Sequence, residues 1–238
     1  MTRPDILVFA SARDEQARAF AERHAASGVV RITPEDLSLE GWVFAASCPA
    51  DATFVASGRI RPAASIKAVL SRLGAVTPDD LPHIHPEDRT YVAAEMSALL
   101  LAFLHSLACP VFNRPDPQCL SGPSWRAEQW LATAHQLGIP VRPWRRSARL
   151  DGALSAAQPS DAQAFTLTII GPGHAGQADA ALVQHARALA DASGAQLLCV
   201  QFESDRADAR FTGAHLWPDL SDPEIAGQVL ALLQGATA

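Results

Sequence analysis

Strand-length apolar runs alternate with helix-like segments along this chain, and the alternation restricts the fold more than any other feature of the sequence. Residues 6–10 are apolar throughout, as in a strand buried on both faces. Residues 14–26 carry apolar side chains at helical spacing and are followed by Gly28, a helix stop. Residues 29–32 then predict a second strand. Strands that alternate with helices indicate an α/β arrangement.

The same alternation continues toward the C-terminus. Further strands are predicted at residues 41–46, 52–57, 165–170 and 197–202. Further helices are predicted at residues 87–107, 124–137, 178–192 and 223–233. Residues 65–70 fit either a strand or a helix. Residues 142–163 begin with basic side chains and continue with Ala, Ser, Asp and Pro, so this stretch is the best candidate for a linker.

Charge and apolar content argue against two classes of partner. The net charge of −6 argues against a nucleic-acid binder, because phosphate contacts need a surplus of Lys and Arg. No apolar run approaches the roughly 20 residues of a membrane span, and the N-terminus lacks the apolar stretch of a signal peptide. The four cysteines show no CxxC pair, which favours reduced thiols over a Cys109–Cys119 disulfide. We therefore expect a cytoplasmic protein.

A glycine-rich hexapeptide at residues 171–176 (GPGHAG) matches GxGxxG between a predicted strand and a predicted helix. Gly171, Gly173 and Gly176 would let the backbone approach the pyrophosphate of NAD(P) or FAD, with Glu203 as the acid that binds the ribose. The spacing from Gly176 to Glu203 is longer than usual for this fingerprint. We therefore favour a tight strand-to-helix turn in which glycine supplies positive φ.

A cluster of arginines with one tryptophan lies at the start of the candidate linker. The residues are Arg142, Trp144, Arg145 and Arg146. Guanidinium groups bind carboxylates and phosphates bidentately, and Trp adds stacking and cation–π contacts. The cluster predicts a docking site for an acidic peptide or protein partner, and a solvated basic linker is the equal alternative.

A second candidate binding cluster comes from the expected strand ends and from the start of the long helix. It consists of Arg72, Arg89, Tyr91, Glu95, Asn113 and Arg114. Ligands of α/β folds bind at strand ends, so this cluster is where a small molecule or a peptide end would bind. The alternative is structural, with Arg72 and Glu95 forming an ion pair that stabilises the fold.

Histidines and carboxylates gather at residues 83–88, where His83 and His85 precede Glu87 and Asp88. Two histidines in an extended segment point to one side, as a metal site requires. No third ligand is identifiable in the sequence, and His174 or His215 could join only through the fold. A solvated loop is favoured, and we predict no metal site. No residue stands out as catalytic.

The order of several segments carries a family resemblance. The segments are residues 67–72 (KAVLSR), 87–91 (EDRTY), 112–115 (FNRP), 125–130 (WRAEQW), 134–141 (AHQLGIPV) and 217–220 (WPDL). In this order the chain resembles the RimK-like ATP-grasp proteins, including those that modify ribosomal peptides. The resemblance implies an α/β fold with an N-terminal pre-ATP-grasp, Rossmann-like domain and a truncated ATP-grasp-like C-terminal subdomain. These would span residues 1–118 and 165–238, with a helix and linker at 119–164 replacing the ATP lid.

The chain departs from that family where nucleotide and metal would bind. Ser124, Trp125 and Arg126 stand where the family has a lysine at the start of the third helix, and residues 142–164 contain no lysine and are too few for a lid. Gln201 replaces an acidic residue, and residues 213–215 (GAH) align with the family's metal-binding Glu-Val-Asn. Glutamine and glycine supply no carboxylate for Mg²⁺, without which acyl-phosphate formation loses its electrostatic support.

The resemblance with these departures implies a catalytically degenerate ATP-grasp-like protein rather than a working ligase. We expect it to bind a peptide, an amino acid or a biosynthetic enzyme, with ribosomal-peptide modification as the suggested pathway. No cofactor is expected, and a homo-oligomer is compatible with the sequence. The alternatives are a lidless ligase or transferase acting on a carboxylate, with ATP–Mg²⁺, and a dinucleotide-binding protein using the glycine loop.

Overall fold

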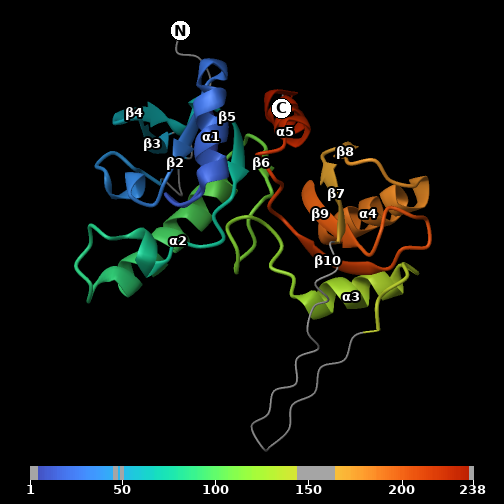
Figure 1. The fold of residues 1–238 in the computed structure, drawn as a ribbon. Helices are drawn as coiled ribbons and strands as arrows, with labels where there is room; N and C mark the ends of the chain where they lie inside the picture. Colours follow the sequence, from blue (N-terminus) through green and yellow to red (C-terminus); the bar gives the residue numbers. More distant parts are fainter. Residues whose placement is uncertain (1–4, 45–47, 49–50, 144–163, 236–238) are drawn as a thin grey trace, which may run out of the picture.

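The computed structural model describes residues 5–44, 48, 51–143 and 164–235. Within these residues the chain forms two four-stranded sheets and a two-stranded hairpin, with helices packed around them (Figure 1). The strands of the first sheet come from the N-terminal half of the chain and those of the second from the C-terminal half. Trp144, Arg145 and Arg146 of the predicted docking cluster lie outside the described residues.

The N-terminal sheet is parallel, with strand order β2-β1-β5-β6. Its strands are β1 (Asp5–Phe9), β2 (Val29–Ile32), β5 (Ile66–Ser71) and β6 (Val111–Phe112). Side chains of β1 alternate between two cores, because Leu7 packs on one face and Val8 on the other. Both faces of this sheet are therefore covered, as its continuous apolar runs predict.

Different helices cover the two faces of the parallel sheet. α1 (Glu15–Arg23) begins at the N-cap Asp14, whose side chain accepts from Ala17 N, and buries Phe20 on one face. α2 (Arg89–Ser106) buries Phe103 and Leu104 on the other face. A hairpin of β3 (Thr53–Ala56) and β4 (Arg59–Pro62) adds Phe54 to the α2 side. The short 3₁₀ helices are η1 (Ala25–Ser27), η2 (Asp36–Ser38), η4 (Ala63–Ser65) and η5 (Pro78–Asp80).

The C-terminal sheet is antiparallel, with strand order β10-β9-β7-β8. Its strands are β7 (Phe165–Ile170), β8 (Gly173–Ala175), β9 (Leu197–Phe202) and β10 (Phe211–His215). Helices α3 (Ala127–Gln136) and α4 (Ala180–Ser193) pack on one face of this sheet through a continuous apolar core. The opposite face lacks such a continuous apolar cover among the described residues, and this difference positions the candidate site.

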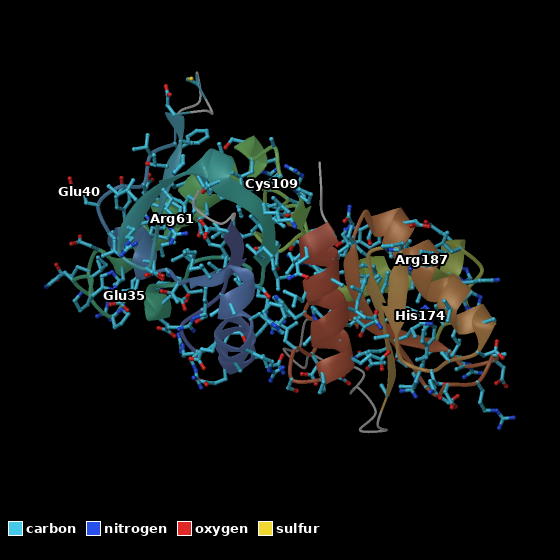
Figure 2. All side chains as sticks on the ribbon, turned by 90° about the horizontal axis from the view of Figure 1, so that it is seen from above. Glu35, Glu40, Arg61, Cys109, His174 and Arg187 are labelled. Carbon is cyan, nitrogen blue, oxygen red and sulfur yellow. The ribbon has the colours of Figure 1, made fainter. Side chains whose placement is uncertain are left out.

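The last helix, α5 (Pro223–Gly235), joins the two halves. Its buried residues Ala226, Val229 and Leu233 belong to the same core as Ile6 and Val8 of the parallel sheet. That core also contains Ile170 of the antiparallel sheet. Figure 2 shows α5 lying between the two halves. The chain therefore returns to its N-terminal half after completing the second sheet.

The sequence predicted most of these elements, and the structure resolves one ambiguous segment and corrects others. Residues 65–70 form a strand because Ala68, Val69 and Leu70 lie buried between β1 and β6. β4 was missed, since an exposed edge strand has no continuous apolar pattern. In the predicted strand 41–46, the described part forms a single bridge, Val43–Thr53. Helix α3 begins at Ala127 with Arg126 as its N-cap, so Ser124 is not the cap.

No helix within the described residues is long and apolar enough to cross a membrane. The four cysteines are free thiols, so Cys109 and Cys119 do not form a disulfide.

Candidate functional site

Arg72, at the carboxyl end of β5, forms hydrogen bonds within the chain that stabilise the fold. Its Nε donates to Asp14 Oδ2 at 2.8 Å, and one of its terminal nitrogens donates to the Pro218 carbonyl at 2.7 Å. Its side chain is only 7% exposed. The structural alternative, an ion pair between Arg72 and Glu95, is wrong in its partner, because Arg72 pairs with Asp14 and Glu95 lies exposed on α2. Arg72 therefore connects the parallel sheet to the segment that leads into α5.

The other predicted residues on α2 do not converge with Arg72. Arg89 donates to the carbonyls of Ile84 and Pro82, each at 2.8 Å, and so holds the loop before its own helix. Tyr91 is 69% exposed, and Arg114 is exposed in the loop after β6. Their role as a joint ligand site stays a prediction that no contact among the described residues supports.

Asn113 is buried and joins the two sheets. Its Nδ2 donates to the Leu197 carbonyl at 2.9 Å, and its Oδ1 accepts from the backbone N–H groups of Gln196 and Leu197, each at 2.8 Å. All of these partners lie at the start of β9, so the Asn113 side chain serves the fold and is not free to bind a ligand.

The glycine-rich hexapeptide forms a β-hairpin, not a strand-to-helix turn. Ile170 pairs with Gly173 across the turn, and Gly171 has φ +53°. Arg187 of α4 donates to the carbonyls of Gly171, Pro172 and Gly173, so the loop directs its carbonyl oxygens, not its amides, at this cation. α4 begins only at Ala180. A dinucleotide fingerprint needs amides at a helix N-terminus, and this arrangement does not provide them.

The remaining predicted residues lie apart from one another. Arg142 Nε donates to Glu203 Oε1 at 2.8 Å. Glu203 is therefore paired with an arginine and does not lie beside the glycine turn. His83 hydrogen-bonds Ser38, whereas His174 lies on β8 in the other half (Figure 2). Among the described residues, no group of three or more His, Cys, Asp and Glu is placed to hold a metal ion.

The face of the antiparallel sheet opposite α3 and α4 presents polar side chains, and we call it the open face. Its residues are Thr166 and Thr168 of β7, Cys199 and Gln201 of β9, and Gly213 and His215 of β10. Cross-strand pairing sets Thr168 against Cys199 and Cys199 against His215. The first residues of α5 and the loop before it lie over part of this face and enclose a cavity of about 370 Å³.

The cavity has a neutral floor and an acidic rim. Thr168, Cys199 and His215 lie inside it, and Asp219, Asp222 and Glu224 lie at its edge with Trp217. Burial raises the pKa of the Cys199 thiol to about 11, so this thiol is protonated and weakly nucleophilic at neutral pH. Burial, reinforced by the charge of Arg72, lowers the pKa of His215 below its usual value. Hydrogen bonds from Ser221 lower the pKa of Asp219, which keeps its negative charge.

Sequence reasoning missed this cavity. The signal was present in β7, where Thr166 and Thr168 alternate with the buried Leu167 and Ile169. That period of two places polar side chains on one face of the strand. What the sequence could not supply was the position of α5 over that face.

Gln201 and Gly213 are direct cross-strand partners on the open face. A side-chain carbon built on Gly213 would lie 3.1 Å from Gln201 Oε1, so the Gln201 amide extends over the glycine. These are the two positions to which the RimK-like resemblance assigns acidic metal ligands. The pair supplies one amide group and no carboxylate.

Comparison with solved structures finds chains of the same overall architecture. The ATP-grasp ligase PsnB, complexed with a phosphomimetic variant of a minimal precursor, Mg and ADP, aligns with TM-score 0.68 and 14% identity over 98% of this chain and 99% of PsnB. The macrocyclase MdnC from Microcystis aeruginosa MRC, bound with precursor peptide MdnA, aligns with TM-score 0.66 and 12% identity over 98% of this chain and 100% of MdnC.

A RimK domain ATP-grasp protein from Sphaerobacter thermophilus DSM 20745 aligns with TM-score 0.53 and 17% identity over 97% of this chain and 100% of that chain. No family model matches the sequence, and no curated protein matches it. At these identities the structural likeness establishes an ATP-grasp-like fold and confirms the predicted fold class.

Proposed function

We propose that this protein is a catalytically degenerate ATP-grasp-like protein that binds a peptide, an amino acid or a peptide-modifying enzyme in a biosynthetic pathway. The observation that carries this proposal is the pairing of Gln201 with Gly213 on the open face. It leaves no carboxylate at the two strand positions where the resemblance implies one.

The residues of the open face do not fit a magnesium–nucleotide complex. Mg²⁺ prefers carboxylate and water oxygens in near-octahedral geometry. The Gln201 amide offers one neutral oxygen, and the His215 imidazole and the protonated Cys199 thiol are softer donors that suit other metals. We therefore derive no phosphoryl-transfer step for this chain.

The length of the connection between α3 and β7 also supports the proposal. It spans residues 137–164, far fewer than the many tens of residues of an ATP lid that the resemblance implies. We retain the division into an N-terminal α/β domain at 1–118, a helix and linker at 119–164 and a C-terminal subdomain at 165–238 as part of the proposal. The packing of α5 on β5 means that the first and last of these segments would act as one body.

The peptide-binding half of the proposal draws on proteins of the same fold. MdnC was crystallised with its precursor peptide, and PsnB with a minimal precursor. A chain that keeps this fold but lacks the magnesium ligands could retain peptide binding without chemistry. Arg142, beside α3 and β10, is a described residue at which an acidic segment of such a partner would dock, in competition with Glu203.

Binding and turnover of nucleotide test the proposal most directly. Thermal unfolding with millimolar ATP–Mg²⁺ should leave the midpoint unchanged, since a specific ligand at about 100 times its Kd would add about 2.7 kcal/mol to the free energy of unfolding. Fluorescence anisotropy with a panel of labelled synthetic peptides should find binding that is independent of ATP. ADP release that depends on peptide would instead establish a lidless ligase.

A gain-of-function variant sharpens this test. The double substitution Gln201→Asp with Gly213→Glu restores two carboxylates to the open face, and an aspartate side chain, being shorter than that of Gln201, leaves room beside position 213. We expect the double variant to bind Mn²⁺, measured by electron paramagnetic resonance, at least about tenfold more tightly than the parent chain. Equal binding by the parent chain would show that its open face already holds a metal and would contradict the proposal.

A further inference from the structure

The cavity on the open face is large enough for one amino-acid side chain. Its volume of about 370 Å³ falls within the range of small-molecule sites. Its floor contains Thr168 and Cys199, each 2% exposed, and the hydroxyl and thiol of this pair meet each other only in a long contact of 3.7 Å. A buried hydroxyl with so weak a partner retains capacity to accept a hydrogen bond from a group that enters the cavity.

The charge around the cavity favours a cation. Three carboxylates, those of Asp219, Asp222 and Glu224, line its rim, and none of the described lining residues is a Lys or an Arg. The charge of Arg72 acts on His215 and Asp219 of the cavity, and the pairing of Arg72 with Asp14 offsets part of that charge. The imidazole of His215, facing the same space, is neutral near pH 7 because burial and Arg72 lower its pKa. The three rim carboxylates therefore outnumber the single, partly compensated charge of Arg72, and the rim is net negative.

The three carboxylates are not equally available to a ligand. Asp222 Oδ1 accepts from Glu224 N at 2.8 Å and so caps α5, and Asp219 Oδ1 accepts from Gln16 and Ser221. The Glu224 carboxylate accepts from the amide of the half-buried Gln228 at 3.2 Å. Of the rim carboxylates, Glu224 is the one that can turn toward a ligand at the loss of a single side-chain hydrogen bond.

An exposed tryptophan completes the cavity. Trp217 is 47% exposed at the edge of the cavity, in a protein that buries most of its large apolar side chains. An indole face attracts cations through its ring quadrupole, and it also covers the aliphatic stem of a Lys or Arg side chain. Ala175 and Ile225 add apolar lining. These side chains, the indole, the neutral acceptors and the acidic rim together match an alkyl chain that ends in a positive charge.

We propose that the cavity between β7, β9, β10 and the start of α5 binds the cationic side chain of a lysine or arginine in a peptide partner. The aliphatic stem lies against Trp217, the charged end donates to Thr168 in the floor, and the rim carboxylates attract the cation from the edge of the cavity. This proposal rests on the proposed function, because it names the residue type by which the peptide is recognised.

Capped amino acids test the proposal. Nα-acetyl-lysine amide and Nα-acetyl-arginine amide should bind in calorimetric titrations, and Nα-acetyl-norleucine amide, which lacks only the ammonium group, should bind at least about tenfold more weakly. Norleucine amide carries its ammonium on the α-carbon and separates a peptide N-terminus from a side chain as the source of the cation. Equal affinity for the acetylated norleucine compound would overturn the proposal.

Two variants and a matched control locate the site. Glu224→Gln and Trp217→Leu should each lower the affinity for acetyl-lysine amide about two- to fivefold. Asp191→Asn makes the same change of charge at an exposed position on α4, on the covered face of the sheet, and should leave the affinity unchanged. If Trp217→Leu unfolds the chain, Glu224→Gln carries the test alone. Equal losses for Glu224→Gln and Asp191→Asn would indicate general surface attraction and contradict a site.

The outcomes separate this inference from the proposed function. If synthetic peptides bind with no dependence on Lys or Arg, the cavity assignment fails and the degenerate peptide binder stands. If acetyl-lysine amide binds as expected and the chain also releases ADP from ATP in the presence of peptide, the cavity assignment stands and the proposed lack of chemistry fails.

Discussion

The glycine turn at residues 171–176 and the open face lie on the same antiparallel sheet, yet they use their polar groups in opposite ways. In the turn, three successive carbonyls accept from Arg187, and Gly171 is packed against Leu232. On the open face, Thr168 and Cys199 have one long contact with each other, and His215 faces a cavity. A polar group whose hydrogen bonds are all made within the chain stabilises the fold. A polar group that can still form a hydrogen bond is where a ligand gains binding free energy.

The strongest test of this contrast is at Asn113, whose amide is engaged by the start of β9. Asn113→Ala would leave the buried N–H of Leu197 and the part-buried N–H of Gln196 without their acceptor, at about 1–3 kcal/mol for each buried group. We expect urea unfolding to show a loss of about 3 kcal/mol or more in the free energy of unfolding. Arg114→Ala, at the next and exposed position, should change it by less than about 0.5 kcal/mol. Similar small effects at both positions would contradict the role of Asn113 in joining the sheets.

Substitutions in the glycine turn should have a smaller effect on the free energy of unfolding, and Gly173 serves as the control for Gly171. Gly171→Ala forces a residue with a side chain to φ +53° and sets its Cβ 2.6 Å from Leu232 Cδ1, so we expect a loss of about 1–3 kcal/mol. Gly173→Ala meets nothing closer than 3.6 Å and should stay within about 0.5 kcal/mol of the parent chain. Thermal unfolding measures both. NAD(P) or FAD binding that both substitutions weaken would restore the nucleotide interpretation of this loop.

The same contrast explains what the sequence could predict. Strands β1 and β9 are nearly continuous apolar runs, and helices α1, α4 and α5 each bury a stripe of side chains at helical spacing, so local patterns predict these elements. The hairpin was missed because GxGxxG describes local backbone freedom, which serves a turn between two strands as well as a turn into a helix. Arg187, whose hydrogen bonds to the turn distinguish a hairpin from a turn into a helix, lies on the next helix.

The predicted site residues also show that local sequence patterns do not identify partners that are distant along the chain. Arg72 and Asn113 were expected at strand ends, and the structure places them there. Their partners, Asp14, Pro218 and Leu197, are distant in sequence, so no local pattern could tell a ligand-binding side chain from one that joins two halves. The cavity on the open face depends on α5, the last element along the chain, and was therefore the feature least visible in the sequence.

The smallest effect that we predict concerns the pH dependence of stability at His215. Cys199 is the cross-strand partner of His215, and Asp219 lines the same cavity. Burial and the charge of Arg72 lower the pKa of His215, and a backbone hydrogen bond at Trp217 opposes this shift. The unfolded chain therefore binds a proton at His215 at higher pH than the folded chain does. Stability contributed by the neutral imidazole is present above the unfolded pKa of about 6.5 and is lost as the pH falls toward the folded value.

Urea unfolding at about pH 7.5 and about pH 5.5, on either side of the unfolded histidine pKa, measures this contribution. His24 is also shifted downward, by burial and by Arg23, and contributes in the same direction, so His215→Gln should reduce the difference between the two pH values without removing it. His174→Gln, at an exposed position on β8, should leave the difference as it is in the parent chain. Affinity for acetyl-lysine amide should fall over the same pH interval in the parent chain, because a protonated His215 repels the cation, and should fall less in His215→Gln. A ligand affinity that is insensitive to this substitution would place the cation away from His215 and toward the rim at Glu224.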